Sequence, residues 1–163
     1  KEAIERGEYP EYEAEVDRIF NSPKARWCKF KNRDRTRDEV AITVMNGKIG
    51  EIFLRNEKER VLNLTAETLN QHGTNHPLYE KLKKNLIYHD LIDITSGLII
   101  EVKWWAEQYV DDFDSKGWKG LISALRKKDH IFADKVIILA KNRSGDKIRF
   151  HKCYDVEALL LRD

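Results

Sequence analysis

Residues 88–103 read YHDLIDITSGLIIEVK, which places three carboxylates and a lysine inside two apolar, β-branched runs. The tripeptide TSG at 95–97 separates the runs, and glycine supplies the positive φ that tight turns require. This pattern predicts a β-hairpin. A pairing that closes around residues 95–96 would put Asp90 directly opposite Glu101.

The period of a β-strand decides which of these side chains share a face. Successive residues alternate, so Glu101 and Lys103 point to one side and Val102 to the other. Two carboxylates that lie close together repel each other unless a cation sits between them. Mg²⁺ suits this arrangement, because it commonly uses one or two protein carboxylates together with phosphate oxygens of a substrate. Lys103 could then orient or help to deprotonate the attacking water, and phosphodiester hydrolysis is the reaction that this pattern predicts.

The same residues resemble the motif of the PD-(D/E)xK superfamily of restriction-endonuclease-like nucleases. Asp90 matches the first aspartate of that motif, and Glu101-Val102-Lys103 matches its (D/E)xK tripeptide. His89 stands where the family usually has proline. The resemblance implies a restriction-endonuclease-like core, Mg²⁺ or Mn²⁺ as cofactor, and activity as a metal-dependent nuclease, with DNA endonuclease activity favoured.

Two further carboxylates are candidates for the same site. Asp93 also lies upstream of Glu101 at a spacing that some members use, although the apolar residues after Asp90 fit the family pattern better. Many members carry an upstream helical glutamate that touches the metal, and Glu51 is the corresponding residue here. The alternatives are that Glu51 is an ordinary solvated side chain, and that Glu101 and Lys103 form an exposed ion pair worth only ~0–1 kcal/mol.

Basic residues are concentrated in one stretch of the first quarter of the chain. Such a stretch is typical of a surface that binds phosphates, because each Lys or Arg can neutralise one. Trp27 and Phe30 lie between the basic residues, and aromatic rings can stack on bases. The predicted nucleic-acid-binding residues are Lys24, Arg26, Lys29, Lys31, Arg33, Arg35 and Arg37. DNA is favoured over RNA as the partner, and a homodimer would allow both strands of a symmetric site to be cut. The alternative is an exposed basic loop.

Length and composition limit the class of protein. At 163 residues the chain is expected to form a single nuclease-like domain over 1–163, with a peripheral helix and basic loop within 1–35. No apolar run approaches the ~20 residues that cross a bilayer, and the chain has no signal peptide, so no membrane partner and a cytoplasmic site of action are expected. Two cysteines without a C-x-x-C spacing agree with a reduced compartment.

The remaining patterns predict an α/β domain with a mixed β-sheet flanked by helices. Helices are expected at 11–20, 117–128 and 156–161, and strands at 60–65, 135–139 and 148–151. Residues 36–54 favour a helix that begins with a capping box, although Asn46-Gly47 leaves a hairpin of 40–45 against 49–54 as the alternative. Residues 70–76 are expected to be a polar loop, and 104–113 a loop or helix start bordering the substrate.

Two other functions remain open at this point. One is a noncatalytic nucleic-acid-binding module on the same fold, which would bind through the basic stretch and need no divalent metal. The other is a ribonuclease or the nuclease domain of a toxin, because the same hairpin occurs in nucleases of different biological context.

Overall fold

The computed structural model describes residues 1–86, 90–127 and 132–162. The chain divides into two compact units, Lys1–Ile49 and Gly50–Asp163, and helix α4 (Arg37–Glu57) continues through the division. His89, which the family resemblance compares with a proline, lies outside the described residues.

The first unit is mainly helical. Its elements are α1 (Glu2–Glu5), α2 (Pro10–Phe20), α3 (Pro23–Arg26), the paired short strands β1 (Trp27–Cys28) and β2 (Arg33–Asp34), and the first part of α4. Val16 and Val40 are fully buried, and the Tyr12 hydroxyl donates to the carbonyl of Ala41 at 3.1 Å, which ties α2 to α4. The predicted helix at 11–20 is confirmed.

The start of α4 decides between the two predictions for residues 36–54. The Glu39 N–H donates to the Thr36 hydroxyl at 3.3 Å, and the Thr36 N–H donates to the Glu39 carboxylate at 3.2 Å. This reciprocal pair is a capping box, which satisfies two backbone donors that a helix otherwise leaves unpaired. The helix is therefore confirmed and the hairpin alternative is wrong.

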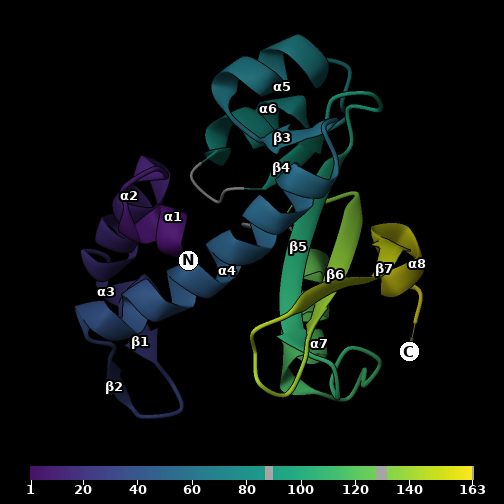
Figure 1. The fold of residues 1–163 in the computed structure, drawn as a ribbon. Coiled ribbons are helices and arrows are strands. Elements are labelled where there is room, and N and C mark those ends of the chain that lie inside the picture. The colour runs from purple at the N-terminus through teal and green to yellow at the C-terminus, as the bar shows by residue number, and fades with distance from the viewer. Residues whose placement is uncertain (87–89, 128–131, 163) are drawn as a thin grey trace. The chain divides into compact units, whose positions relative to one another are not determined.

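The second unit is built on a five-stranded sheet with the order β3-β4-β5-β6-β7. Its strands are β3 (Val61–Asn63), β4 (Leu91–Asp93), β5 (Ile99–Ala106), β6 (Lys135–Lys141) and β7 (Ile148–Asp155). The β5–β6 pair is parallel and the other three pairs are antiparallel (Figure 1). The mixed sheet that the sequence predicts is thus confirmed.

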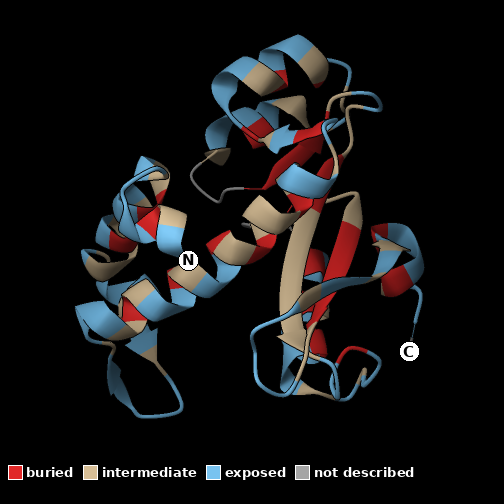
Figure 2. Ribbon diagram, in the orientation of Figure 1, coloured by how far each residue is buried: buried red, intermediate tan, exposed pale blue. Residues whose placement is uncertain are grey.

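Helices cover both faces of this sheet. Trp118 and Leu121 of α7 (Lys116–Lys127) and Leu159 of α8 (Val156–Leu160) pack against Val136 and Ile138 of β6. On the other face, Leu54 of α4 packs in a cluster with Leu91, Ile100 and Leu139. Figure 2 shows that β6 is buried along most of its length, as expected for a strand between two helical layers.

The central hairpin has the predicted register. Leu91 pairs with Ile100 and Ile92 with Ile99, so extending the ladder by one position puts Asp90 opposite Glu101. The turn closes with a hydrogen bond from the Gly97 N–H to the Asp93 carbonyl at 2.7 Å. Gly97 has a φ of +73°, which is the conformation for which the sequence provides a glycine.

Replacing Gly97 with alanine is expected to destabilise the protein by more than the ~1–2 kcal/mol of the backbone conformation alone. A Cβ at this position would lie 2.8 Å from the carbonyl oxygen of His72. Gly145 is the matched control, because it has the same φ of +73° and nothing within 4 Å of its Cβ position. Urea unfolding of the two variants measures the difference, and equal losses would contradict a close contact at Gly97.

Other elements differ from the sequence-based expectation. The predicted polar loop at 70–76 is wrong for its first part, because helix α5 (Ala66–His72) extends into it. Thr65 and Thr68 form a capping box that starts this helix, a signal that the turn-forming residues further on obscure. Helix α6 (Tyr79–Lys84) is not predicted at all, and β7 is longer than the expected 148–151. Residues 104–106, expected to belong to a loop or helix start, instead extend strand β5.

Candidate active site

Asp90, Glu101 and Lys103 come together at the antiparallel β4–β5 pair. The Lys103 Nζ lies 3.3 Å from the Glu101 Oε1, and the side chains are 35% and 14% exposed, respectively. Asp90, just before β4, is only 7% exposed, and its backbone carbonyl accepts a hydrogen bond from the Leu64 N–H at 2.9 Å. The carboxylate is therefore anchored to the sheet through its own main chain.

The environment of Asp90 strongly disfavours its charged form. Burial is the largest cause that raises the pKa of this carboxyl well above its usual range, followed by the charge of Glu101 and a hydrogen bond with it. Lys103 opposes the shift but does not cancel it. The Asp90 Oδ1 is buried and accepts no hydrogen bond from any of the residues in 1–86, 90–127 and 132–162. A buried oxygen without a partner beside a second carboxylate is a site that a proton or a cation would stabilise.

Glu51 acts on the same carboxyl from helix α4. Its charge also raises the pKa of Asp90, although by less than burial or Glu101 does. The preceding Gly50 faces strand β5, since a Cβ there would make ordinary van der Waals contact with the Cβ of Trp104 at 3.5 Å and with Val102 at 3.6 Å. The structure thus brings the predicted helical glutamate into electrostatic range of the cluster.

Asp93 has different partners. Its Oδ1 accepts from the Thr95 N–H at 2.9 Å, and its Oδ2 lies 3.3 Å from the Arg60 Nε. Three positions separate Asp93 from Asp90 along an extended strand, so the two side chains point to opposite faces. The structure does not bring Asp93 to the Asp90–Glu101 pair, and its carboxylate stabilises the hairpin turn. This arrangement favours Asp90 over Asp93 as the candidate ligand.

Asp90 and Glu101 are the residues that could hold a divalent cation. Within the described ranges, no group of three His, Cys, Asp or Glu side chains is arranged to enclose a metal. Two carboxylates nevertheless fit the way in which Mg²⁺ binds, because this ion retains several waters and takes further oxygens from a phosphate substrate. The unpartnered Asp90 Oδ1 agrees with such a ligand set.

Comparison with known proteins yields no relative. No protein-family model, no curated protein and no solved structure matches this chain. Helices long and apolar enough to span a membrane are also not found among the described residues. The chemistry of the site therefore rests on the residues that form it.

The predicted basic stretch is largely paired within the first unit. Arg26 binds Asp34 at 2.7 Å, Arg33 and Lys31 bind Glu39 at 2.8 and 3.3 Å, and Arg37 binds Asp17 at 2.8 Å and Glu13 at 3.1 Å. Arg35 donates to the carbonyl of Ala25 at 2.8 Å, while Lys24 and Lys29 are exposed. Hydrogen bonding from Arg33 is the main reason that the pKa of Glu39 falls to about 2. The phosphates of a nucleic acid would therefore have to displace these acidic partners before they could bind most of the basic side chains.

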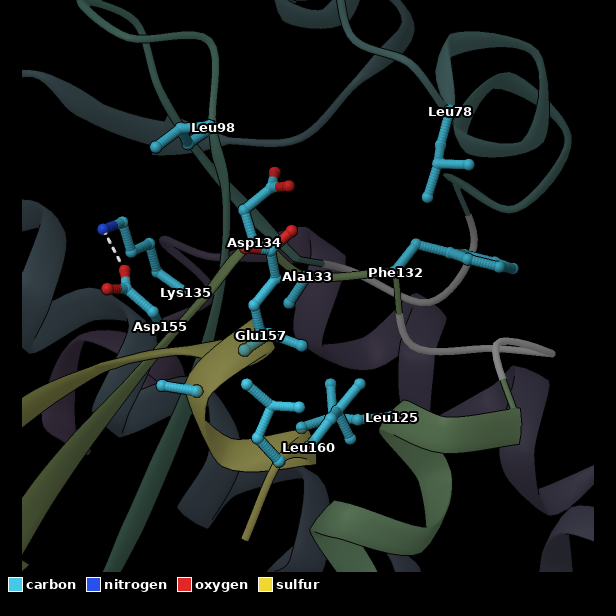
Figure 3. Close-up of a pocket in the computed structure, with 13 residues that line it drawn as sticks. Leu78, Leu98, Leu125, Phe132, Ala133, Asp134, Lys135, Asp155, Glu157 and Leu160 are labelled. Atoms are coloured by element: carbon cyan, nitrogen blue, oxygen red, sulfur yellow. Dashed lines mark hydrogen bonds and ion pairs between the residues drawn. The ribbon is translucent and has the colours of Figure 1, made fainter.

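A cavity of about 650 Å³ lies beside α8 and is separate from the carboxylate pair (Figure 3). Lys135 pairs with Asp155, the Asp134 Oδ2 accepts from the Ile99 N–H at 2.9 Å, and Glu157 also lines the cavity. These interactions hold the ends of β5, β6 and β7 together. Three of its four described charged lining residues thus take part in structural interactions.

The pair His76–Asp134 is a structural feature that the sequence does not reveal. The His76 Nε2 lies 2.7 Å from the Asp134 Oδ2, and its Nδ1 accepts from the Leu78 N–H at 3.0 Å. Because Nδ1 is an acceptor, Nε2 carries the proton and donates it to the aspartate. Both ring nitrogens are thus occupied, which makes His76 a link between distant segments instead of a metal ligand.

Proposed function

We propose that this protein is a metal-dependent nuclease that hydrolyses phosphodiester bonds, with DNA as the favoured substrate. The observation that carries the proposal is the cluster of Asp90, Glu101 and Lys103, in which the Asp90 Oδ1 is buried and lacks a partner among the described residues. An ion pair without a function would not require a second, desolvated carboxylate beside it.

The order of elements in the second unit supports the same proposal. Helix α4, strand β3, the β4–β5 hairpin, helix α7 and strand β6 follow one another along the chain. This order of helix, strand, hairpin, helix and strand resembles the core of the restriction-endonuclease-like superfamily. Asp90 and the Glu101-Val102-Lys103 tripeptide lie on the hairpin, as they do in the motif of that superfamily.

Each residue has a distinct role in the proposed reaction. Asp90 and Glu101 would hold Mg²⁺ or Mn²⁺, which supplies stabilisation of the negative charge that develops on the phosphate. Lys103 lies beside Glu101 and on the same strand face, where its ammonium can orient the attacking water and stabilise the negative charge that develops during the attack. Glu51 adds negative charge near Asp90 and thereby favours cation binding.

Incubation with nucleic acid tests the proposal directly. Supercoiled plasmid, single-stranded DNA and structured RNA are each mixed with the protein in Mg²⁺, Mn²⁺ or EDTA. We expect cleavage of DNA in either metal and none in EDTA. Binding of nucleic acid without cleavage in any metal would instead favour the noncatalytic binding module, and cleavage of RNA alone would indicate a ribonuclease.

A further inference from the structure

A second cavity lies at the far end of strand β5, the strand that carries Glu101 and Lys103. Its volume is about 590 Å³, and its walls include Trp104, Trp105, Tyr109, Lys116 and Lys141. Trp105 follows Lys103 by two positions and so shares its strand face, roughly 7 Å further along. Glu101, Lys103 and the lining residue Trp105 therefore follow one another on the same face of β5.

Aromatic rings form the sides of this cavity. Trp104 and Trp105 are successive strand residues that point to opposite faces, so the cavity wraps around the end of β5. Trp105 is held in place by an edge-to-face contact with Trp118, with ring centroids 5.1 Å apart. Tyr109, by contrast, is 47% exposed and leaves much of its ring available to a ligand.

Cationic groups accompany the rings. The Lys141 Nζ lies 4.8 Å from the centroid of the Trp104 ring, and Lys116 lines the same cavity. Asp112 is the one acidic residue among the described lining residues. The cavity therefore combines stacking surfaces with an excess of positive charge, as sites for single-stranded nucleic acid do.

The indole of Trp104 differs from that of the core residue Trp118. The Trp118 Nε1 donates to the Val110 carbonyl at 2.9 Å, which is the usual arrangement for a buried indole. The Trp104 Nε1 is buried but has no acceptor in the part of the chain that the structure describes. Trp118 is therefore fixed as a core residue, whereas Trp104 retains a hydrogen-bond donor that its neighbours leave unused.

We infer that this cavity binds an unpaired nucleobase of a DNA strand, next to the phosphate on which Lys103 would act. Tyr109 and the tryptophans would stack on the base, and the two lysines would contact the adjoining phosphates. A base inside a duplex is already stacked and paired, so the substrate class is single-stranded or locally unpaired DNA. The role in cleavage rests on the proposed nuclease function, whereas binding of the base does not.

Fluorescence anisotropy of a labelled oligo(dT) strand, measured in EDTA with the full chain, tests the inference. We expect Tyr109→Ala to weaken binding about fivefold or more, and Tyr109→Phe to bind like the wild type because it keeps the ring. Phe150→Ala is the matched control, since Phe150 is also 47% exposed and has the Lys58 Nζ 5.6 Å from its ring centroid. The wild type should bind the single strand more tightly than a duplex of the same length.

The outcomes separate this inference from the proposed nuclease function. Binding that depends on Tyr109, together with no cleavage in any metal, would retain the base-binding cavity and reject the nuclease. If DNA is cleaved and Tyr109→Ala, Phe150→Ala and the wild type bind the single strand equally well, the nuclease function is retained and the base-binding cavity is rejected. Failure of the wild type to prefer the single strand would also overturn the inference. Circular dichroism of each variant establishes that the fold is retained.

Discussion

Lys103→Met is expected to lower the rate of metal-dependent DNA cleavage by roughly 10²–10³-fold, the range associated with loss of one positioned group that stabilises developing charge. The side chain lies 3.3 Å from Glu101 and is 35% exposed, so removing its charge should have little effect on stability. Methionine keeps the length of the apolar stem but supplies no charge and no hydrogen-bond donor. Single-turnover cleavage of a labelled DNA with excess enzyme measures the rate of the chemical step.

Lys83→Met is the matched control for this variant. Lys83 also lies near a glutamate, with its Nζ 3.9 Å from Glu80, but it is on helix α6 and outside the carboxylate cluster. Its cleavage rate should remain within a factor of two or so of the wild type, as for an exposed ion pair of small energy. A Lys103→Met variant that cleaves as fast as Lys83→Met would show that Lys103 takes no part in the reaction.

Asp90→Asn is expected to abolish cleavage and yet to stabilise the protein in EDTA at neutral pH, on the order of 1–3 kcal/mol. Burial and the neighbouring Glu101 raise the pKa of Asp90, so ionising this carboxyl costs more in the folded chain than in the unfolded chain. The asparagine side chain is neutral and nearly isosteric, and so avoids this cost. Such a gain of stability with loss of activity is typical of catalytic groups that are held in unfavourable surroundings.

The pH dependence of the Asp90→Asn effect has a definite sign. A raised pKa in the folded state means that wild-type stability falls as the pH rises from the ordinary pKa of aspartate to the raised pKa, because over this range the unfolded chain has lost a proton that the folded chain keeps. The stability that the asparagine variant gains over the wild type should therefore increase with pH up to the raised pKa of Asp90. It should vanish at pH values below the ordinary pKa of an aspartate. Urea unfolding over a pH series in EDTA measures it.

Two comparisons sharpen this experiment. Asp93→Asn should destabilise the protein, because the Asp93 carboxylate accepts turn hydrogen bonds and pairs with Arg60. Mg²⁺ should raise the stability of the wild type by mass action but have little effect on Asp90→Asn. A loss of stability in Asp90→Asn at neutral pH, or an equal response of both proteins to Mg²⁺, would argue against a buried carboxylate that binds the metal.

The hairpin could be predicted in detail because its determinants are local. The glycine at Gly97 and the alternation of apolar residues specify a turn and a register, and one residue of slippage would move every side chain to the other face. The observed pairs Leu91–Ile100 and Ile92–Ile99 follow this register. The pairing of Glu101 with Lys103 then follows from the strand period alone.

The role of Asp93 could not be predicted from the same stretch. Its spacing from Glu101 makes it a second candidate ligand beside the preferred Asp90, and only the folded turn shows that its oxygens bind the Thr95 N–H and Arg60. The basic stretch presents a similar difficulty. The partner of Arg37 at 2.8 Å is Asp17, which precedes it by 20 residues and belongs to another helix.

The sequence by itself determined the α/β class, the hairpin, its register and the shared face of Glu101 and Lys103, because these depend on strand period and turn chemistry within a few residues. The tertiary structure decided the burial of Asp90, the reach of Glu51 from α4 and the aromatic cavity at the end of β5. These features join segments that lie tens of residues apart, as in the link between His76 and Asp134. Such contacts arise when helices pack on the sheet and exclude water, and no local pattern encodes which distant side chains that packing will bring together.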